Sequence, residues 1–431
     1  MSLSIAGNRD LRLLLGARAV RAFGDGYVSL LLPFYLTTLG FSAFEIGTIA
    51  TGTLFGSGLA TLAVGHVAHR IAQRKVLMFA CVLMTATGLG FAAFSDFWIL
   101  LAIAVVGTLN PSSGDVSVFL PLEHAKLSEA IERQSRTAAF AAYAIVGTLV
   151  AAVGALAAGL PSLFAAKAQD ALRAMFILYA ALGLICLALY RGLSNHSVPA
   201  HATPASALSR SKKRVYTLAA LFSLDAFAGG FVVQSLLALW LLERFELSVA
   251  LAGTIFFWSG ILSAVSYLIA VRIARRFGLV NTMVFTHLPA NVLLILTAFA
   301  PSLTIAIAFL LARSLLSQMD VPTRSAFVMS VVAKHERAAA ASVTSVPRSL
   351  ASAVGPLLAG YLLSVSSFGW PLIAAGGLKI VYDLTLFKLF SPLSMKSCAK
   401  KQRVLCGGRT EGRHDHILSD SECGGEHTAT E

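Results

Sequence analysis

Long apolar runs separated by short polar segments dominate this chain. A helix needs about 20 mostly apolar residues to cross a bilayer, because each residue adds about 1.5 Å and the hydrocarbon core is about 30 Å thick. Each run of this length therefore predicts one membrane-spanning helix. Such runs lie at residues 12–39, 44–67, 76–95, 97–121, 137–160, 171–190, 215–242, 247–271, 280–300, 302–330, 341–365 and 369–391.

The longest polar break, residues 191–214, divides these runs into six and six. The pattern predicts an all-α membrane protein with twelve transmembrane helices in two six-helix bundles. Its expected units are an N-terminal bundle at 1–190, a central cytoplasmic linker at 191–214, a C-terminal bundle at 215–391 and a disordered cytoplasmic tail at 392–431.

Composition agrees with a membrane protein, since 57% of the residues are apolar and 13% are charged. Soluble domains carry about 25% charged residues. The low charged fraction excludes a soluble enzyme, a disordered chain and a disulfide scaffold. The Cys and His residues of the tail lack the spacing of a closed zinc site, so we expect no metal and no cofactor.

The net charge of +13 would suit a nucleic-acid binder if the basic residues formed one surface. Most of the 34 Lys and Arg instead lie at the termini and in the even-numbered connections, whereas the odd-numbered connections hold Lys167, Arg173 and Arg244. Positive charge is retained on the cytoplasmic side. Both termini are therefore expected in the cytoplasm, with no nucleic-acid partner. The expected location is a cell membrane, specifically a bacterial inner membrane, and the expected state is a monomer.

The two halves repeat short stretches in the same order, at offsets of 201 to 206 positions. Such an internal repeat is typical of transporters built from duplicated bundles. The matching stretches are Ala22-Phe23 with Gly26 and Ala226-Phe227 with Gly230, Gly47-Thr48-Ile49 and Gly253-Thr254-Ile255, Asp115-Val116 and Asp320-Val321, Glu132-Arg133 and Glu336-Arg337, and Ala152-Val153-Gly154 and Ala353-Val354-Gly355.

With this repeat the chain resembles the major facilitator superfamily over about residues 10 to 392, and in character its drug/proton antiporters. The family's loop motif after the second helix reads approximately G-x-L-A-D-R-x-G-R-R/K. Here the loop keeps the glycine and basic residues but has His69 at the acidic position. A related loop lies in the second half, and span eleven holds a G-P-x-x-A-G sequence similar to an antiporter motif. The residues matched in these motifs are Gly65, Arg70, Arg74, Lys75, Arg276, Gly278, Gly355 and Pro356.

The resemblance implies that the first, fourth, seventh and tenth helices line a central cavity. Each of these helices carries one aspartate, and ionisable residues inside a membrane usually face water, pair with each other or bind a ligand. The candidate residues for solute or proton binding are accordingly Asp25, Asp115, Asp225 and Asp320.

Arginines accompany two of these aspartates. Arg21 precedes Asp25 by four residues, which places both on one helical stripe. In span ten, Arg313, Asp320 and Arg324 form a similar stripe, with Gln318 nearby and a kink expected at Pro322. Glu123 is expected at the membrane edge.

The sequence predicts a secondary active transporter that moves a small solute by alternating access in proton-coupled efflux. One alternative is an uptake symporter or uniporter for an organic or inorganic anion, which the basic groups of spans one and ten would suit. Another is a non-transporting membrane sensor or scaffold. The usual motifs of hydrolases, nucleotide-binding enzymes and zinc enzymes are absent from the sequence, so no enzyme is expected.

Overall fold

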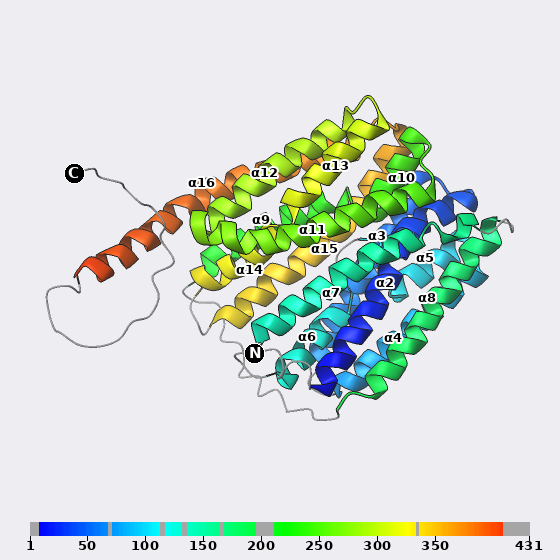
Figure 1. Cartoon of the computed structure of the whole chain (residues 1–431), viewed down its shortest axis with the longest axis horizontal. Helices are drawn as coiled ribbons and strands as arrows, with labels where there is room; N and C mark the ends of the chain where they lie inside the picture. The colour runs from blue at the N-terminus through cyan, green and yellow to red at the C-terminus, as the bar shows by residue number, and fades with distance from the viewer. Residues whose placement is uncertain are drawn as a thin grey trace.

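The computed structural model describes residues 8–67, 71–112, 117–131, 136–163, 168–194, 211–332 and 336–407, and this part of the chain contains helices and no strand (Figure 1). Helices suit the apolar runs because they satisfy every backbone polar group internally. Asn8, Asp96 and Ser248 each begin a helix by accepting a hydrogen bond from backbone N–H groups of its first turn.

The N-terminal half forms one bundle, drawn in blue to green in Figure 1. Its elements are α2 (Arg9–Thr38), α3 (Ala43–Val67), α4 (Gln73–Ala93), α5 (Phe97–Val106), α6 (Phe119–Ala130), α7 (Arg136–Ala157), the 3-10 turn η1 (Leu160–Leu163) and α8 (Ala168–Arg191).

The C-terminal half forms a second bundle beside the first (Figure 1). Its elements are α9 (Lys212–Gly230), α10 (Gln234–Phe245), α11 (Val249–Phe277), α12 (Leu279–Ala298), α13 (Leu303–Ser317), α14 (Asp320–Val331), α15 (Arg337–Val365) and α16 (Trp370–Gly407). The expected tail begins as helix, since α16 continues past Pro392 to Gly407, and residues 408–431 lie outside the described part.

Three expected spans are each divided into two helices, which corrects their prediction as continuous runs. Span four separates into α5 and α6 around Pro111, and span seven separates into α9 and α10 after Gly230. Span ten breaks between Ser317 and Asp320, at Gln318, whose carbonyl Pro322 would crowd in a continuous helix. A proline inside a helix clashes with the carbonyl four residues earlier, so Pro322 is tolerated in the first turn of α14 and not beyond it. Among the described residues, eight segments are long and apolar enough to cross a membrane, and α5 and α13 are shorter apolar helices.

The two bundles pack their helices in the same pattern. In the N-terminal bundle α2 packs against α7 and α8, and α4 packs against α8. In the C-terminal bundle α9 packs against α15 and α16, and α12 packs against α16. A Cβ atom on Gly26 would lie 2.1 Å from the carbonyl oxygen of Ala151, and one on Gly230 would lie 2.5 Å from that of Ser352. Matching stretches of the sequence repeat therefore occupy matching places.

The bundles meet where α3 packs against α15 and α7 packs against α11. A Cβ atom on Gly47 would lie 2.5 Å from the oxygen of Pro356, and one on Gly253 would lie 2.5 Å from that of Ala155. These contacts lie where α3 and α11 begin, next to the end of α2, and we call this end of the molecule the distal end. Side chains larger than hydrogen are excluded there because the helix backbones touch.

Candidate functional site

A cavity of about 180 Å³ lies between the two bundles and is lined by residues of both. The helices α2 and α7 contribute from one side, and α10, α11 and α13 contribute from the other. Among its described lining residues the charged ones are Asp25 from α2 and Arg313 from α13. The cavity therefore has an acidic wall in one bundle and a basic wall in the other.

Hydroxyl and amide groups complete the polar lining of the cavity. Ser112 and Ser317 occupy equivalent positions of the repeat, 205 residues apart, and both line it. The hydroxyls of Ser259 and Ser314 lie 2.6 Å apart, so α11 and α13 are joined by a hydrogen bond within the lining. Such groups suit a ligand that both donates and accepts hydrogen bonds.

Arg313 differs from the other buried cations of the molecule. Within the described residues its guanidinium makes no hydrogen bond or ion pair, and its Nε atom is buried without a partner. Three strongly buried cations, Arg21, Arg324 and Lys379, have acidic partners, as the next two clusters show.

The N-terminal bundle holds a buried cluster around Glu123, which we call the N-bundle cluster. Arg21 forms an ion pair with Glu123, and Tyr143 donates a hydrogen bond to the same carboxylate. Tyr190 donates to its other oxygen at 2.5 Å, and the ring of Phe119 lies 4.3 Å from the Arg21 guanidinium. Glu123 is fully buried inside the bundle, and its expected depth at the membrane edge stays a prediction. Glu123 lies on the buried face of α6.

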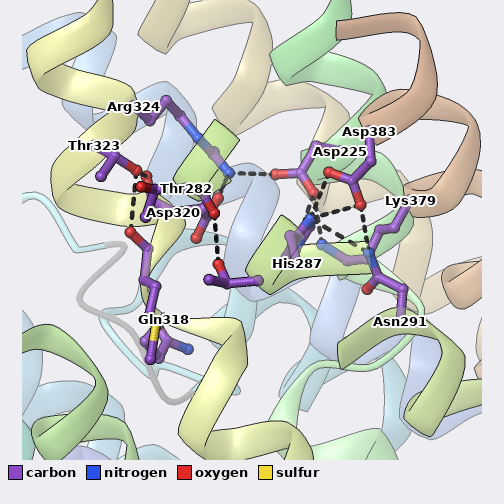
Figure 2. A network of polar contacts seen from close by, with 12 residues as sticks. Asp225, Thr282, His287, Asn291, Gln318, Asp320, Thr323, Arg324, Lys379 and Asp383 are labelled. Carbon is purple, nitrogen blue, oxygen red and sulfur yellow. Dashed lines mark hydrogen bonds and ion pairs between the residues drawn. The ribbon is translucent and has the colours of Figure 1, made fainter. Parts of the chain in front are cut away.

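The C-terminal bundle holds a larger buried network, which we call the C-bundle cluster (Figure 2). Asp225 accepts hydrogen bonds at 2.7 Å from Arg324 of α14 and at 2.7 Å from Lys379 of α16. Arg324 also forms an ion pair with Asp320, one turn earlier on α14. Both carboxylates are thereby partnered by fixed cations, which buried charges require.

A histidine extends this cluster toward α12. His287 lies between two carboxylates, with Nδ1 3.0 Å from Asp383 and Nε2 4.0 Å from Asp225. Asn291, one turn later on α12, donates to Asp383 at 2.9 Å. The cluster thus joins α9, α12, α14 and α16 through ionisable groups buried inside the bundle (Figure 2).

The two clusters invert charge at one position of the repeat. Arg21 and Asp225 are 204 residues apart, the same offset as the Ala-Phe pairs that follow them. Arg21 pairs with a carboxylate of α6, and Asp225 pairs with the guanidinium of α14. Each bundle therefore ties its first helix to its fourth span by an ion pair of opposite polarity.

The predicted site residues are divided among three places. Asp25 and Arg313 line the cavity, Arg21 belongs to the N-bundle cluster, and Asp225, Asp320 and Arg324 belong to the C-bundle cluster. The single stripe expected from Arg313 to Arg324 is wrong because the break before α14 separates its two ends. Asp115 lies outside the described residues.

Lys379, His287 and Asn291 were missed in the sequence, as were the tyrosines of the N-bundle cluster. The available signal was the presence of polar residues inside apolar runs nine and twelve. These two runs are not among the four helices that the family resemblance places around the cavity.

The motif residues mainly mark helix ends and close contacts. Arg74 lies near the start of α4 and donates a hydrogen bond at 2.5 Å to the carbonyl oxygen of Arg191. Gly278 ends α11 with a φ of 82°, a conformation that favours glycine. A Cβ atom on Gly355 would lie 2.5 Å from the backbone of Gly230. The other motif residues are Gly65 at the end of α3, Lys75 in the first turn of α4, Arg276 in the last turn of α11 and Pro356 within α15, while Arg70 lies outside the described residues.

Comparison with known proteins gives a consistent result. A family model described as Major Facilitator Superfamily matches residues 14–319 and 218–403. An uncharacterized membrane protein of Saccharomyces cerevisiae is 24% identical over 92% of this chain and 96% of its own length.

Solved structures show the same fold at low identity. A nucleoside transporter, NupG, is 14% identical with a TM-score of 0.68, over 89% of this chain and 99% of its own. A bacterial homolog of the human lysosomal transporter Spinster, in an inward-facing and unoccupied conformation, is 16% identical with a TM-score of 0.67, over 90% and 98%. The human organic anion transporter MFSD10 is 17% identical with a TM-score of 0.61, over 88% and 99%.

Proposed function

Because the chain belongs to the Major Facilitator Superfamily, we propose that it moves a small polar solute across the membrane by alternating access, with the cavity between the bundles as its solute site. The observation that carries this proposal is the cavity lining, to which both bundles contribute polar side chains. A site shared between two bundles changes its exposure when one bundle rocks against the other.

The contacts at the distal end support a conformational state in which the two bundles are closed against each other at that end. Backbone contact at Gly47 and Gly253 holds the bundles together there, and the N–H of Ser235 donates to the oxygen of Pro111 at 3.0 Å across the same interface. If both termini are cytoplasmic, as the basic residues predict, the distal end faces outward. The proposed transport cycle then alternates this closed outer end with an open one.

Proton coupling is the second part of the proposal, and the charge of the C-bundle cluster supports it. The cluster contains three carboxylates and two permanent cations, Arg324 and Lys379, so with neutral His287 it carries one net negative charge. Arg348 on the neighbouring α15 lies close enough to interact electrostatically with the cluster, but it is not counted in this charge because no hydrogen bond or ion pair of the described residues joins it to the three carboxylates. A buried net charge is costly, and one proton taken up at the contact of His287 and Asp383 would remove it. In the N-bundle cluster the charges of Arg21 and Glu123 cancel, so this pair has no net charge for a proton to neutralise.

Efflux is the direction proposed from the sequence, and uptake of an anion is the alternative that Arg313 favours. Both directions use the same cavity. The sensor or scaffold alternative lacks an equivalent observation, since nothing in the described residues gives it a binding surface for a partner. The relative from yeast shows that a similar protein occurs in a eukaryote, so a bacterial inner membrane stays a prediction. The cytoplasmic termini and the monomeric state also stay predictions.

Replacing the histidine of the C-bundle cluster tests proton coupling. In proteoliposomes with an imposed pH gradient, we expect the wild-type protein to accumulate solute. The His287→Gln protein should accumulate at least about tenfold less, which corresponds to a loss of about 1.4 kcal/mol or more of driving force. Solute exchange without a gradient should persist, because glutamine can still hydrogen-bond to Asp383. The measurement is radiolabelled flux of small acids and polyols, together with the pH inside the vesicles.

His124→Gln is the matched control, since His124 lies in the other bundle and contacts the rings of Phe140 and Tyr143. This variant should keep gradient-driven accumulation. Accumulation that ignores the pH gradient in wild-type protein would contradict the coupling and leave alternating access standing.

A further inference from the structure

Arg313 is a buried cation that reaches the cavity without an acidic partner. In the part of the chain that the structure describes, Arg21, Arg324 and Lys379 each have a carboxylate within ion-pair distance, whereas Arg313 has none. A charged side chain in the middle of a bilayer costs about 2.5–3.5 kcal/mol on insertion scales. An arginine kept there without a partner in the protein therefore indicates a partner that comes from outside it.

We infer that Arg313 binds the anionic group of the transported solute and that this solute is a small hydroxylated organic anion. The inference rests on the proposed function and names its substrate class. A guanidinium presents several N–H donors in one plane, which match the two oxygens of a carboxylate or a phosphate. Among the lining residues that the structure describes, no other side chain carries positive charge, so the anion has one place to bind there.

The opposite wall determines how the solute lies. Asp25 repels an anionic group and accepts hydrogen bonds from hydroxyl groups, so the solute places its anionic end on Arg313 and its hydroxyl end toward α2. The hydroxyls of Ser112, Ser314 and Ser317 lie along the lining and supply donors and acceptors to the same ligand. Ser314 and Ser112 already hydrogen-bond within the protein, to Ser259 and Asn110, and a hydroxylated ligand can add hydrogen bonds to these hydroxyls that an apolar ligand of the same size cannot make.

The repeat shows that the cation belongs to one bundle alone. The position equivalent to Arg313, 205 residues earlier, is Thr108. The cavity is therefore asymmetric in charge between the two bundles. Its volume of about 180 Å³ suits a small solute.

Thermal stabilisation of the purified full chain tests this inference, since a ligand that binds the folded state raises its melting temperature. Three probes share one carbon skeleton: glycerate, glycerol 3-phosphate and glycerol. We expect at least one of the two anions to stabilise the wild-type protein and glycerol to have little effect. The two anions distinguish a carboxylate from a phosphate as the recognised group.

Arg313→Gln should weaken binding of the stabilising anion about tenfold to a hundredfold, because a hydrogen bond to a charged group is lost. Arg313→Lys keeps the charge and should retain part of the affinity. The matched control is Arg272→Gln on the exposed side of α11, which should bind as the wild type does.

Folding of the variant is checked by its melting temperature without ligand. Removing a buried cation that has no partner should leave the melting temperature of Arg313→Gln equal to or higher than that of the wild type. Binding of glycerol as tight as that of the anions, anion binding that survives Arg313→Gln, or no binding of either anion overturns the inference. The proposed function is judged separately by accessibility of the cavity from the two sides of the membrane, which requires no substrate.

Discussion

Asp225→Ala is expected to lower the free energy of unfolding by about 3–5 kcal/mol and to abolish transport. Asp225 is buried and accepts hydrogen bonds from both Arg324 and Lys379, at 2.7 Å each. Arg324 retains Asp320, but Lys379 has no other carboxylate within ion-pair distance in the described part of the chain. The cost therefore comes mainly from one cation left buried and unpaired. Thermal and denaturant unfolding of the purified protein measure it.

A second substitution separates this cost from general damage to the bundle. Lys379→Met in the Asp225→Ala background removes the unpaired cation, and we expect it to restore part of the lost stability, since an apolar replacement of an ion pair is often neutral. Asp170→Asn at the exposed start of α8 is the control and should have little effect. An Asp225→Ala protein as stable as the wild type would show that the cluster is not held by this carboxylate.

The sequence indicated several of the buried ionisable residues but not how they pair. Spacing along one helix relates Asp320 to Arg324 correctly, because residues four apart lie on one face. It carries no information on Arg21 and Glu123, which are 102 residues apart and lie on different helices, α2 and α6. Pairing across helices depends on packing, so Lys379 and His287 could not be assigned to Asp225 from periodicity.

The fold was more accessible to sequence reasoning than the site was. Apolar length and the central polar break predict the helices and the two bundles, because crossing a membrane imposes both length and apolar character. The breaks before α6, α10 and α14 depend on local backbone, and proline alone indicated two of them. Asp25 and Arg313 were predicted as separate charge clusters on two helices, and it is the meeting of the bundles that places them in one cavity.

Gly47→Ala is expected to shift the protein toward the state open at the distal end and to stop transport. The added Cβ atom would lie 2.5 Å from the oxygen of Pro356 and 2.9 Å from the Cα atom of Gly360, and both are backbone atoms that cannot rotate away. The helices α3 and α15 must therefore separate. Within either bundle α3 and α15 keep their other contacts, so the fold should survive while the interface between the bundles does not.

A cysteine at Ser317 in a cysteine-free protein reports this shift, because Ser317 lines the cavity. A membrane-impermeant thiol reagent added at the distal side should label it faster in the Gly47→Ala protein. Gly58→Ala is the matched control on the same helix, where the new Cβ atom would meet a Leu350 side-chain carbon at 3.6 Å, an ordinary contact.

Both substitutions gain about 1 kcal/mol of helix propensity, so a difference between them isolates the backbone contact from the effect of alanine itself. Equal labelling of the two variants from the distal side would contradict alternation between a closed and an open distal end. Faster labelling in Gly47→Ala alone would show that glycine at the interface of the bundles is what allows the closed state to form, and Gly253, its equivalent on α11, should then respond in the same way.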